Sequence, residues 1–390
     1  MRIALFTDSF PPDINGVATA TQTLFEALKA HGHDVYVVTA NHYGKKVEFK
    51  DNILRIPGIE LKRLYSLILT GPINPKATRI IKQWKLDIIH IQTEAGMGWY
   101  GRNLAHKFKI PLIYTYHTMY VDYTYYVTRG FLDPWAKSIM KIWSKVITSQ
   151  CTELTTPSFK TRNALREYGN NKYINVIPNG INLSMYEEQN VDKEFIEKFK
   201  KEHNLENKYI LLSLGRIAKE KGIDVLIRGY KNFLDTNPSL DTVLLIVGGG
   251  PAQEDLKQLA YDLGIANKVI FTGNVPHEQV PCYYWMADLF LSASITETQG
   301  LTYIEAMASK TLVLCRFDEN LQEVVKDGIT GFYFSDEDSF TKKLTEIINM
   351  PKDAKNKIIE TAYEANKRYS MDTFYERMME VYNRGRRKLW

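Results

Sequence analysis

The sequence predicts an α/β protein made of two doubly wound, Rossmann-like domains that face a central cleft. Short apolar segments of strand length alternate with helical segments along most of the chain, which is typical of parallel sheets covered by helices on both faces. The alternation runs through the first half, stops over a polar stretch and begins again after residue 205. A length of 390 residues is enough for two domains, each with its own core.

The first series begins with an apolar strand over 2–8, a loop with two prolines and a glycine, and a helix over 19–31. Gly32 ends this helix, and a second strand over 34–40 completes a β-α-β unit. Four more segments are predicted to be buried strands, at 86–93, 111–118, 153–158 and 174–180.

The second series follows a polar stretch over 180–205, which has no apolar run and is predicted to be the domain junction. Its predicted strands lie at 209–215, 242–250, 268–273, 288–293 and 311–316. We therefore expect a first domain over 1–185, a second over 186–370, and a C-terminal helix over 371–390 that packs back on the first domain. Doubly wound sheets bind ligands at the carboxyl ends of their strands.

The composition excludes several classes of protein. With 44% hydrophobic and 24% charged residues, the chain is neither disordered nor collagen-like. No apolar run reaches the ~18 residues of a membrane span, and no signal peptide is expected. The three cysteines have no close partner in sequence, which indicates a reducing, cytoplasmic environment and no zinc site.

The net charge of +5 is unevenly distributed. Residues 1–188 hold 23 lysines and arginines against 15 acidic residues, whereas 189–390 hold 27 against 30. This asymmetry predicts an anionic surface as the partner of the first half and a small ligand as that of the second. Nucleic acid is not an expected partner, because no recognition motif accompanies the basic residues.

Two glutamates stand around the expected start of a helix over 302–309. Glu297 lies in the loop after the strand 288–293, Gly300 allows a turn, and Glu305 is expected near the first helical turn. The helix start presents N–H groups to an anion, and two carboxylates can accept hydrogen bonds from sugar or ribose hydroxyls. Alternatively, Glu297 is a surface acid and Glu305 a first-turn acid that stabilises the helix dipole. Their spacing alone does not decide between these alternatives.

A pair of cations follows the first strand of the second series. Arg216 and Lys221 are accompanied by Gly215 and Gly222 and precede the next helix. Two cations with backbone amides suit a diphosphate. A lone basic residue in such a loop is usually just solvated, but this combination favours a binding site.

Two residues of the first half are weaker candidates. Gly16 lies in the loop after the first strand, where backbone can approach a phosphate, but the loop does not match G-x-G-x-x-G and does not predict a dinucleotide site. His117 ends the strand over 111–118. It is either a hydrogen-bonded structural residue or a residue that faces the phosphate site across the cleft.

Together these motifs resemble the retaining glycosyltransferases of the GT-B fold that carry an E-x7-E motif. G-R-I-A-K-E-K-G (215–222) resembles their phosphate-binding loop, and V-I-P-N-G-I-N (176–182) their interdomain stretch. D-S-F-P-P-D-I-N-G-V-A-T (8–19) and Y-T-Y-H-T-M-Y-V-D-Y (114–123) are similar to the bacterial diacylglycerol glucosyltransferases. That subgroup makes monoglucosyldiacylglycerol from UDP-glucose at the cytoplasmic face of the membrane.

The resemblance implies a role for each matched residue. Arg216 and Lys221 would neutralise the donor diphosphate, and Glu305 would hold the ribose hydroxyls. Glu297 would bind the sugar, and His117 would lie beside the reacting sugar and the acceptor. The remaining implied donor-binding residues are Gly16, Val275, Gln299, Gly300 and Leu301. Gln299 stands where many relatives have phenylalanine.

The resemblance implies no metal and no cofactor, with UDP-glucose as the donor substrate. Asp336–Asp338 forms a D-x-D sequence, which is a metal signature of another glycosyltransferase fold. Its place before a helical segment favours an acidic helix start instead. Retention is implied by the family, and both a same-face route and a covalent intermediate stay open.

Membrane contact is predicted for two basic helices of the first half. Residues 74–85 carry basic residues beside isoleucines and a tryptophan, and residues 131–147 carry lysines on one stripe with tryptophans and aliphatics on another. This composition is typical of an interfacial helix, and the alternative is an ordinary amphipathic helix with a solvated basic face. The predicted membrane and acceptor residues are Lys76, Arg79, Lys82, Tyr120, Asp122, Tyr123, Trp135, Lys137, Lys141, Trp143 and Lys145.

These observations predict a membrane-associated glucosyltransferase that acts on diacylglycerol, peripheral on the inner face of the cell membrane. The alternatives are another lipid acceptor such as phosphatidylinositol, another sugar nucleotide, or a non-catalytic protein that binds a nucleotide sugar. The sequence does not predict the oligomeric state.

Overall fold

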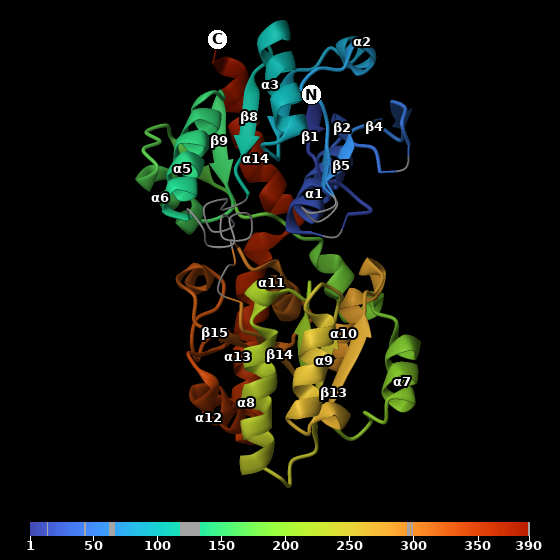
Figure 1. Cartoon of the computed structure of the whole chain (residues 1–390), viewed down its shortest axis with the longest axis vertical. Coiled ribbons are helices and arrows are strands. Elements are labelled where there is room, and N and C mark those ends of the chain that lie inside the picture. Colours follow the sequence, from blue (N-terminus) through green and yellow to red (C-terminus); the bar gives the residue numbers. More distant parts are fainter. Residues whose placement is uncertain are drawn as a thin grey trace. The chain divides into compact units, whose positions relative to one another are not determined.

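The protein is described by a computed structural model that covers residues 1–388, without residues 14, 43, 62–66, 118–132, 295, 296 and 298. The chain divides into two compact units (Figure 1). One comprises Met1–Ile181 and Tyr369–Trp390, and the other comprises Asn182–Arg368. The divisions predicted from the sequence lie after residues 185 and 370. Each unit is an α/β sheet structure with its own hydrophobic core.

The first unit contains an eight-stranded sheet in the order β10-β9-β8-β7-β1-β2-β4-β3. All neighbouring strands are parallel except β3 and β4. The strands are β1 (Arg2–Phe6), β2 (Asp34–Ala40), β3 (Glu48–Lys50), β4 (Ile53–Ile56), β7 (Ile88–Ile91), β8 (Leu112–Thr115), β9 (Glu153–Thr156) and β10 (Ile174–Val176). A separate antiparallel ribbon pairs β5 (Ile59–Leu61) with β6 (Leu67–Leu69).

Most helices of the first unit begin at polar caps. Asn15, Asn74, Ser158 and Ser370 each accept a hydrogen bond from a backbone N–H of the following turn, which satisfies donors that a helix start leaves unpaired. The helices are α1 (Gly16–Ala30), α2 (Pro75–Gln83), α3 (Gly96–Phe108), α5 (Asp133–Ser149), α6 (Phe159–Glu167) and α14 (Met371–Arg387).

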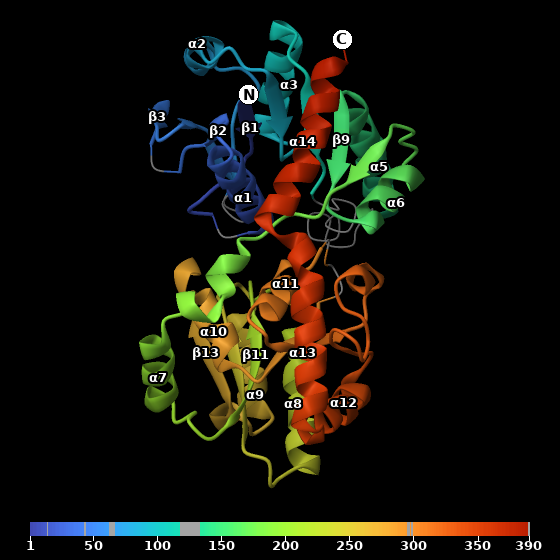
Figure 2. The same ribbon diagram turned by 180° about the vertical axis from the view of Figure 1, so that it is seen from behind.

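Helix α14 belongs to the first unit although it ends the chain (Figure 2). It packs against α1, and its Tyr375 hydroxyl lies 3.0 Å from Nε2 of His33, in the turn between α1 and β2. Glu153 of β9 is buried and forms ion pairs with Arg384 at 3.6 Å and Lys388 at 2.5 Å. The apolar side of α14 joins a core cluster with β1 through Phe374, Met378, Val381 and Tyr382.

The second unit has a six-stranded parallel sheet in the order β13-β12-β11-β14-β15-β16. Its strands are β11 (Tyr209–Leu214), β12 (Thr242–Val247), β13 (Val269–Gly273), β14 (Leu289–Ser292), β15 (Leu312–Arg316) and β16 (Phe332–Phe334). Its helices are α7 (Lys193–Glu202), α8 (Ile223–Thr236), α9 (Gln253–Asp262), α10 (Val280–Met286), α11 (Leu301–Ala308), α12 (Glu337–Asn349) and α13 (Lys352–Asn366).

Short 3-10 turns connect these elements. They are η1 (Leu183–Tyr186), η2 (Glu188–Asn190), η3 (Lys219–Lys221), η4 (Ala266–Lys268), η5 (His277–Gln279), η6 (Glu319–Glu323) and η7 (Lys367–Tyr369). Two of them, η1 and η3, carry residues of the candidate site described below.

The predicted junction over 180–205 is more structured than its polar composition suggests. The second unit begins at Asn182, and α7 occupies much of the stretch. Only Phe199 of α7 is buried, so the helix has too narrow an apolar stripe to be recognised as a core element. Across the described residues, no helix is long and apolar enough to cross a membrane.

Candidate active site

The predicted donor residues of the second unit follow the carboxyl ends of strands in its parallel sheet. Arg216 and Lys221 follow β11, Val275 follows β13, and Glu297 follows β14. β11 pairs with both β12 and β14, and β12 pairs with β13. Because all these strands are parallel, their carboxyl ends share one edge, which is where doubly wound sheets bind ligands.

The structure brings Lys221 and Glu297 together from different loops. Nζ of Lys221 lies 2.6 Å from Oε1 of Glu297, and their side chains are 31% and 14% exposed. Gly222 makes this approach possible, since its φ of 62° is left-handed and an added Cβ would lie 2.7 Å from the Ala293 carbonyl oxygen. The turn that carries Lys221 can therefore pack directly against the end of β14.

Arg216 is held by an acid that the sequence analysis did not select. Its guanidinium forms an ion pair with Glu220, whose side chain is 6% exposed. The four-residue spacing between Arg216 and Glu220 was a usable signal, but Glu220 lies in the short 3-10 turn η3, which has no periodic apolar pattern. A carboxylate therefore orients each of Arg216 and Lys221 near the carboxyl ends of the strands.

Glu305 does not lie in the first turn of α11. The helix begins at Leu301, so Glu305 is its fifth residue, and its side chain is buried. The alternative of a first-turn acid that stabilises the helix dipole is therefore wrong. Glu305 therefore lies in the interior of the second unit.

Two tyrosines bind the Glu305 carboxylate. The Tyr284 hydroxyl donates a hydrogen bond to Oε2 at 2.9 Å, and the Tyr186 hydroxyl of η1 is a second partner. Indole Nε1 of Trp285 donates to the Tyr186 carbonyl at 2.7 Å and holds η1 in place. Burial raises the pKa of Glu305, although the tyrosine hydrogen bonds oppose this shift. No motif pointed to these aromatic partners.

The start of α11 depends on a glycine with left-handed backbone geometry. Its N-cap is Gly300, which has a left-handed φ of 76° and no side chain that could cap the helix. Gln299 is buried directly before it, and Leu301 is the first helical residue. An added Cβ on Gly300 would meet the ring of Tyr303 at 2.6 Å. The backbone therefore takes a course that only glycine permits.

Gly16 of the first unit is the first residue of α1 and is exposed. The N-cap residue Asn15 accepts hydrogen bonds from the amides of Val17 at 3.1 Å and Ala18 at 3.0 Å. Asn15 thus satisfies two amides that a phosphate at this helix start would use. The phosphate contact of Gly16 stays a prediction.

His117 is buried just after β8. Its Nε2 lies 2.7 Å from Oε1 of Gln92, which follows β7. Burial lowers the pKa of His117 to about 4, so the imidazole is neutral at pH 7. Because His117 belongs to the first unit and the donor residues to the second, its place relative to them stays a prediction.

The apolar side of α2 packs inward, contrary to the prediction of a membrane-facing surface. Ile81 and Trp84 are buried in the core of the first unit, where Trp84 stacks on Tyr36 with ring centroids 4.2 Å apart. The exposed basic residues of this helix are Lys76, Arg79 and Lys82. For α2, the alternative of an ordinary amphipathic helix with a solvated basic face describes the structure.

Helix α5 does expose an apolar ridge. Ile139, Ile142 and Val146 are 43%, 65% and 44% exposed, and Lys141 and Lys145 are exposed beside them. The predicted surface residue Trp143 is instead half-buried and packs against the core of the first unit. The exposed ridge is therefore aliphatic over the side chains of α5 that the structure describes.

Five predicted membrane or acceptor residues are not described by the structure. Tyr120, Asp122 and Tyr123 lie outside the described residues. The structure describes the backbone of Trp135 and Lys137 within α5 but not their side chains.

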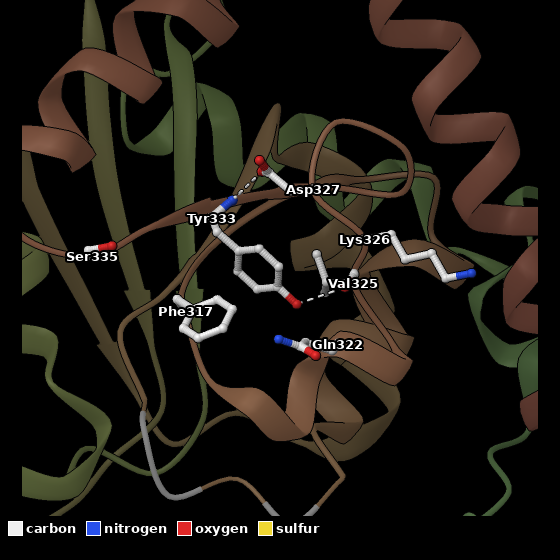
Figure 3. A pocket seen from close by; sticks show the side chains of 7 residues that line it. All are labelled: Phe317, Gln322, Val325, Lys326, Asp327, Tyr333 and Ser335. Atoms are coloured by element: carbon white, nitrogen blue, oxygen red, sulfur yellow. Dashed lines mark hydrogen bonds between the residues drawn. The ribbon is translucent and has the colours of Figure 1, made fainter.

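A hollow of about 540 Å³ lies beside the carboxyl ends of β15 and β16 (Figure 3). The rings of Phe317 and Tyr333 meet edge-to-face with centroids 5.3 Å apart. The Tyr333 hydroxyl donates to the Val325 carbonyl at 2.7 Å. The polar residues around these rings are Gln322, Lys326, Asp327 and Ser335. None of the predicted site residues whose side chains the structure describes lines this hollow.

The acidic sequence at 336–338 is the start of a helix, as predicted. Asp336 is the N-cap of α12 and forms a capping box with Ser339. Within the part of the chain that the structure covers, no group of three or more histidine, cysteine, aspartate or glutamate side chains could hold a metal ion.

Comparisons with known proteins agree with this architecture. Residues 14–185 match the Glycosyltransferase Family 4 profile, and residues 195–365 match the profile described as Glycosyl transferases group 1. The chain is 34% identical to the alpha-monoglucosyldiacylglycerol synthase of Streptococcus pneumoniae, over 98% of this chain and 85% of that relative. It is also 34% identical to the alpha-monoglucosyldiacylglycerol synthase of Acholeplasma laidlawii, over 98% and 99% of the two chains.

Solved structures share the fold at lower sequence identity. Anabaena HepE in complex with UDP and glucose has a TM-score of 0.76 and 17% identity, over 98% of this chain and 100% of that chain. Sucrose-phosphate synthase from Thermosynechococcus elongatus has a TM-score of 0.77 and 20% identity, over 98% of both chains. The chain is therefore a GT-B glycosyltransferase and belongs to the family that includes the alpha-monoglucosyldiacylglycerol synthases.

Proposed function

We propose that this protein transfers glucose from UDP-glucose to 1,2-diacylglycerol, with retention of the anomeric configuration, and forms monoglucosyldiacylglycerol. The proposal is carried by the identity of 34% to two alpha-monoglucosyldiacylglycerol synthases along 98% of the chain. The ion pair between Lys221 and Glu297 supports it, because it joins two motif residues at the edge where the donor is expected.

The proposed reaction breaks the bond between the sugar and the β-phosphate of the donor. Negative charge then grows on the leaving UDP, and fixed cations and helix-start amides stabilise that charge without reorganising. Arg216, Lys221 and the start of α11 supply these groups. Glu297 holds Lys221 and accepts hydrogen bonds from the sugar, and Glu305 accepts from the ribose.

A donor and acceptor screen tests this function. The purified protein is incubated with radiolabelled UDP-glucose, UDP-galactose or GDP-mannose and with diacylglycerol or phosphatidylinositol in mixed micelles. We expect labelled lipid only from UDP-glucose and diacylglycerol, and alkaline-stable α-linked glucose in the product. Transfer from GDP-mannose to phosphatidylinositol would support the alternative acceptor. UDP-glucose binding without transfer to any lipid would support the non-catalytic alternative.

We propose further that α5 attaches the protein to the inner face of the cell membrane. Its exposed ridge of Ile139, Ile142 and Val146 can enter the interface while Lys141 and Lys145 meet anionic head groups. Each lysine near an anionic leaflet contributes about 1 kcal/mol. Reversible, salt-sensitive attachment follows from these contributions.

Vesicle sedimentation tests the attachment. The double variant Lys141→Ala/Lys145→Ala is expected to bind vesicles of phosphatidylglycerol and phosphatidylcholine about thirtyfold more weakly, since two contributions of about 1 kcal/mol are lost. The matched control is Lys352→Ala/Lys357→Ala, which removes two exposed lysines from α13 of the second unit. Equal loss in both double variants would show that net charge, and not α5, determines binding.

A further inference from the structure

A buried hydrogen-bond network leads from the C-terminal helix to His117. The Tyr382 hydroxyl of α14 lies 2.8 Å from Nδ1 of His90, and Nε2 of His90 lies 2.7 Å from Oγ1 of Thr115. The side-chain amide nitrogen of Gln92 lies 3.1 Å from His90, and its oxygen lies 2.7 Å from Nε2 of His117. All five side chains are buried.

The chemistry of the amide fixes the proton on His117. An amide oxygen only accepts hydrogen bonds, so Nε2 of His117 must carry the proton and donate it to Gln92. A neutral imidazole has one protonated nitrogen, and Nδ1 therefore keeps its lone pair. The amide nitrogen of Gln92 only donates, and in the structure it faces His90 while the amide oxygen faces His117. The tautomer assigned to His117 follows from this orientation of the amide.

The other titratable groups of the network are neutral as well. Burial lowers the pKa of His90 to about 3 and raises the pKa of Tyr382 well above its ordinary value. Among the described residues, no carboxylate or cation is hydrogen-bonded to His117, and burial alone accounts for the lowered pKa of this residue. His117 therefore has no described partner that would charge it at neutral pH.

We propose that Gln92 is a positioning residue that holds His117 as the neutral Nε2–H tautomer, so that Nδ1 serves as a hydrogen-bond acceptor for a substrate hydroxyl. The proposal rests on the proposed function and on the place that the family resemblance implies for His117, beside the reacting sugar and the acceptor. It adds a residue that no motif selected and assigns the protonation state in which His117 works. A protonated imidazole would donate from both nitrogens and could not accept a hydrogen bond from the hydroxyl.

Histidine NMR reads the tautomer directly. Long-range nitrogen–proton spectra of the full-length, donor-free protein distinguish the two tautomers, and the spectrum of His117→Gln assigns the signal among the eight histidines. We expect the Nε2–H form of His117 and no titration between pH 5.5 and 8. The Nδ1–H form in the unmodified protein would overturn the proposal.

Gln92→Glu tests the connection to turnover. A carboxylate at this position stabilises the imidazolium and raises the pKa of His117, so kcat is expected to acquire an acid limb between pH 5.5 and 7.5 that the unmodified enzyme lacks. The KM for UDP-glucose is expected to stay within about twofold, since no donor contact is removed. A raised pKa with an unchanged kcat profile would overturn the proposal.

Two further variants keep the test decisive. If Gln92→Glu does not fold, Gln92→Leu removes the hydrogen bond at similar size and is expected to give mixed tautomers and about a tenfold lower kcat at constant KM. Tyr382→Phe disturbs the same buried network away from His117, and an acid limb in this variant would contradict the assignment to Gln92.

If diacylglycerol is not the acceptor, the tautomer is still measured in the donor-free protein, so the two proposals fail separately.

Discussion

Lys221→Ala is expected to lower kcat for glucose transfer by about two to three orders of magnitude, the range found when one preorganised group that stabilises transition-state charge is removed. The loss has two sources. In the proposed reaction the leaving diphosphate loses a fixed cation, and the Glu297 carboxylate loses the partner that lies 2.6 Å from it. Steady-state kinetics with UDP-glucose and diacylglycerol measures the effect, and the KM for the donor is expected to change less than kcat.

Lys219→Ala is the matched control for this variant. Lys219 is exposed, carries the same charge and begins the 3-10 turn that Lys221 ends. We expect the control to keep kcat within about threefold, because screened charges in water act weakly. Comparable losses in both variants would mean that the overall charge of the loop, rather than the geometry of Lys221, stabilises the leaving group.

Glu305→Ala is expected to lower the free energy of unfolding by about 2–6 kcal/mol, since each of two tyrosine hydroxyls left buried without its acceptor costs about 1–3 kcal/mol. The hydroxyls concerned are those of Tyr284 and Tyr186. Chemical denaturation monitored by fluorescence measures the loss. Binding of UDP is expected to weaken in parallel, because the proposed ribose acceptor is removed.

Glu305→Gln separates stability from donor binding. Burial raises the pKa of Glu305 above its ordinary value of 4.5, so the folded protein binds this proton more tightly than the unfolded chain. The contribution of this group to stability is therefore full below pH 4.5 and falls as the pH rises through the raised pKa. Glutamine removes that decline while keeping an acceptor oxygen.

We therefore expect Glu305→Gln to be at least as stable as the unmodified protein at pH 8, with about a tenfold higher KM for UDP-glucose. Denaturation curves at pH 5 and pH 8 and donor titrations measure both quantities. An unchanged KM together with raised stability would assign Glu305 to the interior of the unit alone and remove it from the donor site.

The positions of several strands could be predicted because their apolar runs are continuous. The runs at 34–40, 209–215 and 268–273 coincide with β2, β11 and β13 to within a residue at each end. The short strand β3 was missed because its three residues are exposed and it has a single apolar residue between two charged ones. Such strands form through pairing with a neighbour rather than through their own hydrophobicity.

Residues of the candidate site could be predicted only where they follow the carboxyl end of a predicted strand. Lys221 and Glu297 follow neighbouring parallel strands, and the topology alone brings those ends together. The contacts of Glu305 with Tyr186 and of His117 with Gln92 depend on how side chains pack inside each unit. No local pattern encodes such packing, because tyrosine and glutamine occur throughout the chain for other reasons.

The place of α14 in the first unit determines the order in which the two cores can form during synthesis. The second unit is continuous in sequence over Asn182–Arg368, so its core residues are all present before α14 leaves the ribosome. The first unit lacks Phe374, Met378, Val381 and Tyr382 until α14 is synthesised, after the whole of the second unit. Its amino-terminal part is therefore made first but waits for α14, with the apolar residues that α14 covers exposed in the interval.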